Sequence, residues 1–77
     1  MITVNTSIQV QFAQFCQAMY TQFPTWKAER QVQLAYTRKR NNAGDYYLQI
    51  AVNPLGGYRL PAETQEAVTE VVRQMEG

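Results

Sequence analysis

The chain of 77 residues contains no histidine, a single cysteine and no charged side chain before Lys27. Without histidine, the commonest general base near neutral pH is missing, and a histidine–cysteine metal cluster is excluded. The lone Cys16 cannot form an intramolecular disulfide, and no histidine is present to activate it as a nucleophile. These absences predict a protein that is not an enzyme and that holds no cofactor or metal.

Long apolar runs are also absent, since a membrane-spanning helix needs about 20 predominantly apolar residues. The first residues lack the basic start and the continuous apolar core of a signal peptide. Together with the single cysteine, this favours a cytoplasmic protein that does not contact a membrane. The length predicts one small domain over residues 1–77, and the 45% of hydrophobic residues is enough to form a core.

The N-terminal third predicts a short strand followed by an amphipathic helix. Ile2 and Val4 alternate with polar residues, as in a strand. Thr6 and Gln9 have the spacing of a capping box, which would begin the helix and extend it over about residues 7–22. Its apolar face would contain Ile8, Phe12, Phe15, Cys16, Met19 and Phe23. Cys16 is therefore expected in the core.

The middle of the chain predicts an antiparallel hairpin. Apolar and polar residues alternate over residues 31–36 and 47–52, and residues 41–45 have the composition of a turn. Pairing Arg40 with Tyr46 sets Tyr36 opposite Ile50 and Leu34 opposite Val52, which places the apolar residues on one face. The alternative is a helix over residues 26–38, because Thr25 is a good capping residue.

The last third predicts a short strand over residues 58–60 and a second amphipathic helix from about Pro61 to the C-terminus. The element order is therefore (β)-α-β-β-(β)-α. Because each helix has one apolar stripe and the hairpin one apolar face, the expected fold is α+β, with two helices packed on one face of a small antiparallel sheet. The other face of the sheet would stay open.

The open face of the hairpin is the first candidate site, because it carries polar side chains without charge. Depletion of lysine and glutamate is typical of the centres of protein interfaces. The alternative explanation is a general preference for glutamine in this chain. The candidate interface residues are Gln31, Gln33, Ala35, Thr37, Tyr47, Gln49 and Ala51. This surface, or an edge strand beside it, predicts a protein-binding module that associates with a second copy of itself.

Basic residues at the hairpin tip are the second candidate site. The net charge is only +1, but residues 27–40 contain five cations and one carboxylate, 5 − 1 = +4. Cations contact phosphates, and exposed tyrosines stack on bases. The candidate nucleic-acid-binding residues are Lys27, Arg30, Arg38, Lys39, Arg40 and Tyr47. The alternative is a basic loop that keeps the hairpin soluble and its edge unpaired.

The order helix-strand-strand-strand-helix is similar to that of double-stranded-RNA-binding domains. The resemblance implies RNA contacts from a strand-connecting loop and from the start of the last helix. Here that helix start, residues 61–66, contains Glu63 and Glu66 and no cation, so it would repel phosphate. No binding residue is carried over from the resemblance, and nucleic-acid binding stays the alternative to protein binding.

Overall fold

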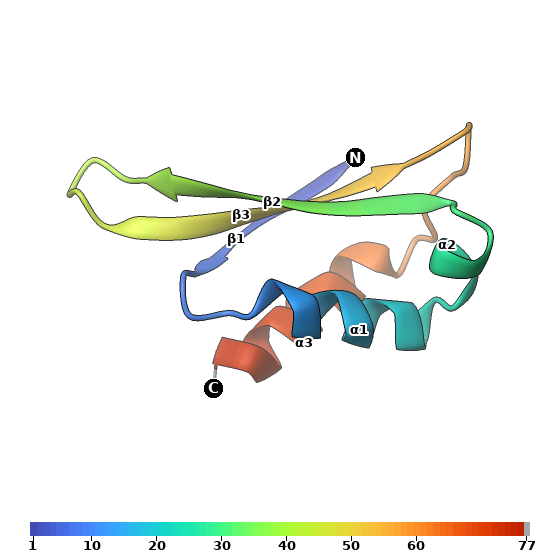
Figure 1. The fold of residues 1–77 in the computed structure, drawn as a ribbon, viewed down its shortest axis with the longest axis horizontal. Helices are drawn as coiled ribbons and strands as arrows, with labels where there is room; N and C mark the ends of the chain where they lie inside the picture. Colours follow the sequence, from blue (N-terminus) through green and yellow to red (C-terminus); the bar gives the residue numbers. More distant parts are fainter. Residues whose placement is uncertain (77) are drawn as a thin grey trace.

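A computed structural model describes residues 1–76 and shows an antiparallel sheet with helices on one face only (Figure 1). The strands are β1 (Ile2–Ser7), β2 (Val32–Arg40) and β3 (Tyr46–Pro54), in the spatial order β1-β3-β2. The helices are α1 (Phe12–Gln22), the single-turn α2 (Thr25–Ala28) and α3 (Thr64–Glu76). The predicted class, α+β with helices packed on one face of a small antiparallel sheet, is confirmed.

The β2–β3 hairpin has the predicted register. Tyr36 pairs with Ile50, Leu34 with Val52, and Arg40 with Tyr46. The turn is held by Asn41, whose side-chain oxygen accepts hydrogen bonds from the amides of Ala43 and Asp45 at 2.9 and 3.0 Å. The alternative, a helix over residues 26–38, is wrong, because only the single turn α2 is helical in this region. From Val32 onward, apolar and polar residues alternate as in a strand.

The N-terminal strand is longer than predicted, and the helix after it begins later. Thr6 lies inside β1, where it pairs with Leu48, so the predicted capping box with Gln9 does not form. Helix α1 begins at Phe12 instead of Ser7, and Gln11 caps it without a side-chain hydrogen bond. The prediction was wrong because Thr6 continues the alternation of Ile2 and Val4, and pairing with β3 satisfies more backbone groups than one helical turn would.

The predicted third strand at residues 58–60 is wrong as well. This segment is a loop, in which the Tyr58 hydroxyl accepts a hydrogen bond from the Trp26 indole Nε1 at 3.1 Å. The last helix begins at Thr64, three residues after Pro61. Strand β1 takes the place beside β3 on the side away from β2, so the sheet is completed by the chain's start rather than by residues 58–60.

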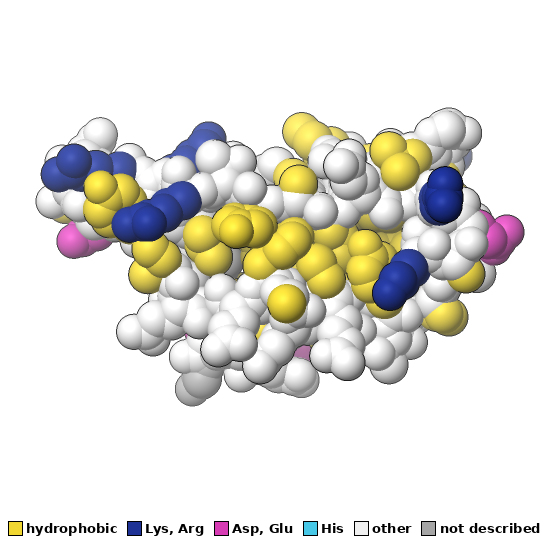
Figure 2. Space-filling view, in the orientation of Figure 1, with side chains coloured by type: hydrophobic (Ala, Val, Ile, Leu, Met, Phe, Trp, Pro, Cys, Tyr) yellow, Lys and Arg dark blue, Asp and Glu magenta, His cyan; other side chains and the backbone are white. Residues whose placement is uncertain are grey.

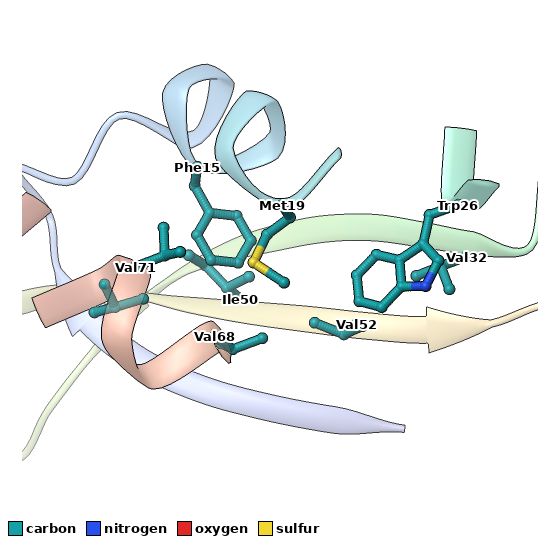
Figure 3. Close-up of a cluster of buried hydrophobic side chains, with 9 residues drawn as sticks. Phe15, Met19, Trp26, Val32, Ile50, Val52, Val68 and Val71 are labelled. Atoms are coloured by element: carbon teal, nitrogen blue, oxygen red, sulfur yellow. The ribbon is translucent and has the colours of Figure 1, made fainter. Parts of the chain in front are cut away.

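The core lies between the sheet and the helices (Figure 3). Phe15 and Met19 of α1 pack in one buried cluster with Ile50 of β3 and Val68 of α3. Trp26 extends the core beneath the far end of the sheet and stacks on Phe23, with ring centroids 4.3 Å apart. The predicted core residue Cys16 is half-buried at the rim of this core.

The hairpin projects beyond the helices, and residues 38–46 form an arm (Figure 1). The projection contributes to the 39 Å long axis of a molecule that is 24 Å and 20 Å across. Tyr36 and Tyr46 lie on the helix-facing side of the hairpin, as the sequence predicts. They are nevertheless 54% and 49% exposed, because Tyr36 lies at the margin of α1 and no helix covers Tyr46 on the arm.

Candidate functional site

The open face of the sheet is lined by small and uncharged polar side chains along most of its length. Ala35 and Thr37 of β2 lie opposite Ala51 and Gln49 of β3, while Gln33 lies opposite Asn53 and Tyr47 lies opposite Lys39. Strand β1 adds Thr3, Asn5 and Ser7 to the same face, and the Gln49 amide donates to the Asn5 side-chain oxygen at 3.5 Å. The only charged side chain on this face is Lys39, on the arm.

One of the predicted interface residues lies elsewhere. Gln31 belongs to the connection between α2 and β2, where its side-chain oxygen accepts from the Thr25 hydroxyl at 2.9 Å. Its backbone carbonyl accepts from the Leu55 amide at 2.8 Å. These two contacts tie the start of β2 to the neighbouring loops. Gln31 is therefore not part of the open face.

The two outer strands differ in how their free edges are protected. Within residues 1–76, no strand pairs with the second side of β1 or of β2. The free edge of β2 carries Arg38, Lys39 and Arg40 at one end and contacts α2 at the other. Strand β1 contains neither charge nor proline along its six residues. Charged residues and proline are the usual protection against unwanted strand pairing, so β1 is the unprotected edge.

The end of β1 is fixed by the last residue of α3. The Glu76 carboxylate accepts a hydrogen bond from the Ser7 amide at 2.7 Å and another from the Thr6 hydroxyl at 3.0 Å. Sequence reasoning missed the role of β1 as an edge strand, although the alternation of Ile2, Val4 and Thr6 was a signal for it.

The basic residues predicted to form one site lie in two separate groups. On the arm, the Arg38 guanidinium lies 4.3 Å from the Tyr46 ring centroid and that of Arg40 lies 5.7 Å from it. Lys27 and Arg30 lie near the opposite end of β2, where the Lys27 ammonium is 5.9 Å from the Tyr20 ring centroid. The predicted stacking residue Tyr47 is on the open face, away from the side where Arg38 and Arg40 contact Tyr46.

Within residues 1–76, no group of three or more histidine, cysteine or acidic side chains is placed to hold a metal ion. The pKa of Glu70 is lowered by a hydrogen bond from its ion-pair partner Arg73, one turn along α3. Burial raises the pKa of Cys16 and of Tyr20, which lies one turn further along α1. A raised pKa makes the Cys16 thiol less nucleophilic at neutral pH.

None of the helices in residues 1–76 has the length and apolar character needed to cross a bilayer. No family model, no curated protein and no solved structure matches the chain.

Proposed function

We propose that this protein is a non-enzymatic protein-binding module that associates with a second copy of itself through the free edge of β1. The single observation that supports this function is the six-residue edge strand without charge or proline. Such an edge presents unpaired backbone amides and carbonyls that a second strand can satisfy. Pairing across a two-fold axis would join two three-stranded sheets into one sheet of six strands.

The side chains of β1 suit this pairing. In a symmetric antiparallel pair centred on Val4, Val4 lies opposite Val4 of the second copy and Thr3 lies opposite Asn5. Ile2 and Val4 are only half-buried in the single chain, and pairing would cover more of both side chains. Thr3 and Asn5 are exposed on the open face, where they meet without charge repulsion.

Strand β2 does not offer the same opportunity for self-pairing. An antiparallel pair of β2 strands would bring the Arg30 end of one copy near the Arg38 end of the other. Like charges that face each other across strands destabilise a pair. The choice between the two edges therefore follows from where the cations lie.

Sedimentation velocity of three variants tests the proposal and its register. Thr3→Lys with Asn5→Lys places lysine opposite lysine across the two-fold axis and should abolish association. Thr3→Lys with Asn5→Glu places lysine opposite glutamate and should restore it. The monomer mass is 8.9 kDa, so a dimer sediments at 2 × 8.9 = 17.8 kDa.

The third variant separates edge pairing from packing of two open faces against each other. Thr37 is exposed on the open face of β2, and β3 separates it from the free edge of β1. Thr37→Lys should therefore leave edge association unchanged, whereas face-to-face packing would bury the lysine and fail. A wild-type chain that remains at the monomer mass at high concentration would refute self-association.

Nucleic-acid binding through the hairpin arm is the second candidate function. It is favoured by the placement of Arg38 and Arg40 around the exposed Tyr46 ring, which combines cations with an aromatic surface. Mobility shifts with single-stranded and duplex DNA and RNA should then weaken steeply as salt is raised. Loss of those shifts in Arg38→Ala with Arg40→Ala would support this function, and no shift at low salt would exclude it.

A further inference from the structure

An apolar band runs along the junction of α1 and β2. Phe12, Cys16 and Tyr20 lie one helical turn apart on α1, and Leu34 and Tyr36 lie on the helix-facing side of β2. The Phe12 and Tyr36 ring centroids are 4.6 Å apart. Leu34 and the three α1 side chains are half-buried, and Tyr36 is exposed. Figure 2 shows hydrophobic side chains gathered in the middle of this face of the molecule.

Two hollows widen the band at its α2 end. One is lined by Cys16, Tyr20 and Lys27 together with Ala13, Gln17 and Thr21. The other lies against the start of β2 and is lined by Tyr20, Trp26, Lys27, Arg30, Val32, Gln33 and Leu55. The second hollow therefore brings apolar walls, two cations and the start of an edge strand together.

Cations flank the band at both ends. Figure 2 shows lysine and arginine side chains at the two ends of this face. The segments at these ends contain five cations, Lys27, Arg30, Arg38, Lys39 and Arg40, and two carboxylates, Glu29 and Asp45, which gives 5 − 2 = +3. Within residues 1–76, the only ion pair is between Arg73 and Glu70 on α3, so the five cations have no ion-pair partner.

The backbone of Arg30 provides an independent reason to assign it to this site. Arg30 is the only residue other than glycine with a positive φ within residues 1–76, at 53°. It follows the end of α2, where the Gln31 amide donates to the Trp26 carbonyl at 3.0 Å and closes the helix. Glycine is the usual residue at such a position because it adopts it without strain. Unfavourable backbone conformations are common at binding sites, where the side chain has a function.

We propose that the free edge of β2, with the apolar band beside it, binds an extended acidic peptide as a fourth strand. Alternate apolar side chains of the peptide lie on the band, and its carboxylates contact Arg30 and Lys27 at one end and Arg38 and Arg40 at the other. A strand rises about 3.3 Å per residue, so the six steps from Val32 to Arg38 span about 20 Å, and a peptide of about nine residues also reaches Arg30 just before the start of β2. The charge that prevents β2 from pairing with itself thus favours a partner of opposite charge.

This site is separate from the edge used in the proposed self-association, because β1 and β2 lie on opposite sides of β3. Peptide binding and dimer formation can therefore succeed or fail independently. Thr3→Lys with Asn5→Lys, which removes association, should leave peptide binding unchanged.

Fluorescence polarisation with a labelled peptide tests the proposal on the full chain. The probe has acidic residues at both ends and alternating valine and threonine between them, about eleven residues in all. We expect saturable binding that weakens with salt. Two control peptides should not bind: one with lysine in place of the acidic residues, and one with alternate backbone amides methylated, which keeps the charges but prevents strand pairing.

Protein variants assign the contacts. Arg30→Gly should weaken binding about threefold to tenfold without loss of fold, and Arg38→Ala with Arg40→Ala should weaken it at least about tenfold. Arg73→Ala, which removes a cation from α3, is the matched control and should bind as the wild type does. Far-UV circular dichroism verifies that each variant is folded.

Three results would overturn the proposal. The first is absence of peptide binding at low salt. The second is equal binding of the lysine-ended or methylated peptide, which would show that neither charge nor strand pairing is used. The third is binding of a labelled single-stranded RNA that depends on Arg30, Arg38 and Arg40 while the acidic peptide fails to compete, which would assign the cations to nucleic acid.

Discussion

The carboxylate of Glu76, at the end of α3, accepts a 3.0 Å hydrogen bond from the hydroxyl of Thr6, at the far end of the sequence. The same carboxylate oxygen accepts a second hydrogen bond, from the Ser7 amide, at 2.7 Å. These two hydrogen bonds attach the end of α3 to Thr6 and Ser7, the last two residues of β1. The attachment also marks where the free edge of β1 ends.

Glu76→Ala is expected to lower the free energy of unfolding by about 1–2 kcal/mol. Thr6 is buried, and the substitution removes the acceptor of its hydroxyl, while bonds to charged groups are stronger than neutral ones. Urea denaturation provides the measurement. Thr6→Val is the partner for a double-mutant cycle, and strictly additive effects of the two substitutions would contradict the coupling.

Arg30→Gly is expected to raise the free energy of unfolding by about 0.5–1 kcal/mol, because glycine adopts the positive φ of this position without strain. Thermal unfolding followed by circular dichroism measures the change. Arg30→Ala is the matched control, since this substitution removes the same guanidinium but keeps a Cβ atom and therefore the backbone strain of a positive φ. Equal stability of the glycine and alanine variants would show that the backbone at this position is not the cause.

Tyr58→Phe is expected to lower the free energy of unfolding by about 1–2 kcal/mol, because it leaves the indole N–H of the fully buried Trp26 without its acceptor. Trp26 is the only tryptophan, so its fluorescence reports this site directly. Entry of water should shift the emission to longer wavelength. Unchanged emission and stability would indicate that the hydrogen bond is dispensable.

Alkylation of Cys16 is expected to be slow and to need a higher pH than alkylation of a free thiol. Burial raises the pKa of the Cys16 thiol, so less of the reactive thiolate is present at any pH below that value. The rate with iodoacetamide should be measured across the alkaline range, with the urea-unfolded chain as control. A folded-state profile that coincides with the unfolded one would contradict the effect of burial.

The sequence predicted the parts of the fold that depend on local periodicity. The β2–β3 register follows from alternation on both sides of a turn, and the apolar stripe of α1 follows from residues spaced three and four apart. The wrong predictions involve Thr6 and Tyr58, whose partners Glu76 and Trp26 are distant in the sequence. The alternation of Ile2, Val4 and Thr6 favours a strand while the spacing of Thr6 and Gln9 matches a cap, and the contact with Glu76 is too distant in the sequence to decide between them.

The candidate site was predictable in composition but not in arrangement. The uncharged open face follows from the alternation of side chains along β2 and β3. The predicted residues that lie on this face in the structure are Gln33, Ala35, Thr37, Tyr47, Gln49 and Ala51. The separation of the basic residues into two groups does not follow from sequence, because α2 and the positive φ of Arg30 set the direction in which the chain enters β2. The free edge of β1 becomes visible only once β1 is placed beside β3.

Isotope-filtered nuclear Overhauser spectroscopy detects self-pairing of β1 at the level of single residues. Equal amounts of isotope-labelled and unlabelled chain are mixed, so that only contacts between copies are detected. We predict intermolecular contacts between Val4 protons of the two copies and between Thr3 and Asn5, and none from the centre of the open face around Gln49. Intermolecular contacts that map to Gln49 or to β2, or the absence of any intermolecular contact at high concentration, would contradict self-pairing of β1.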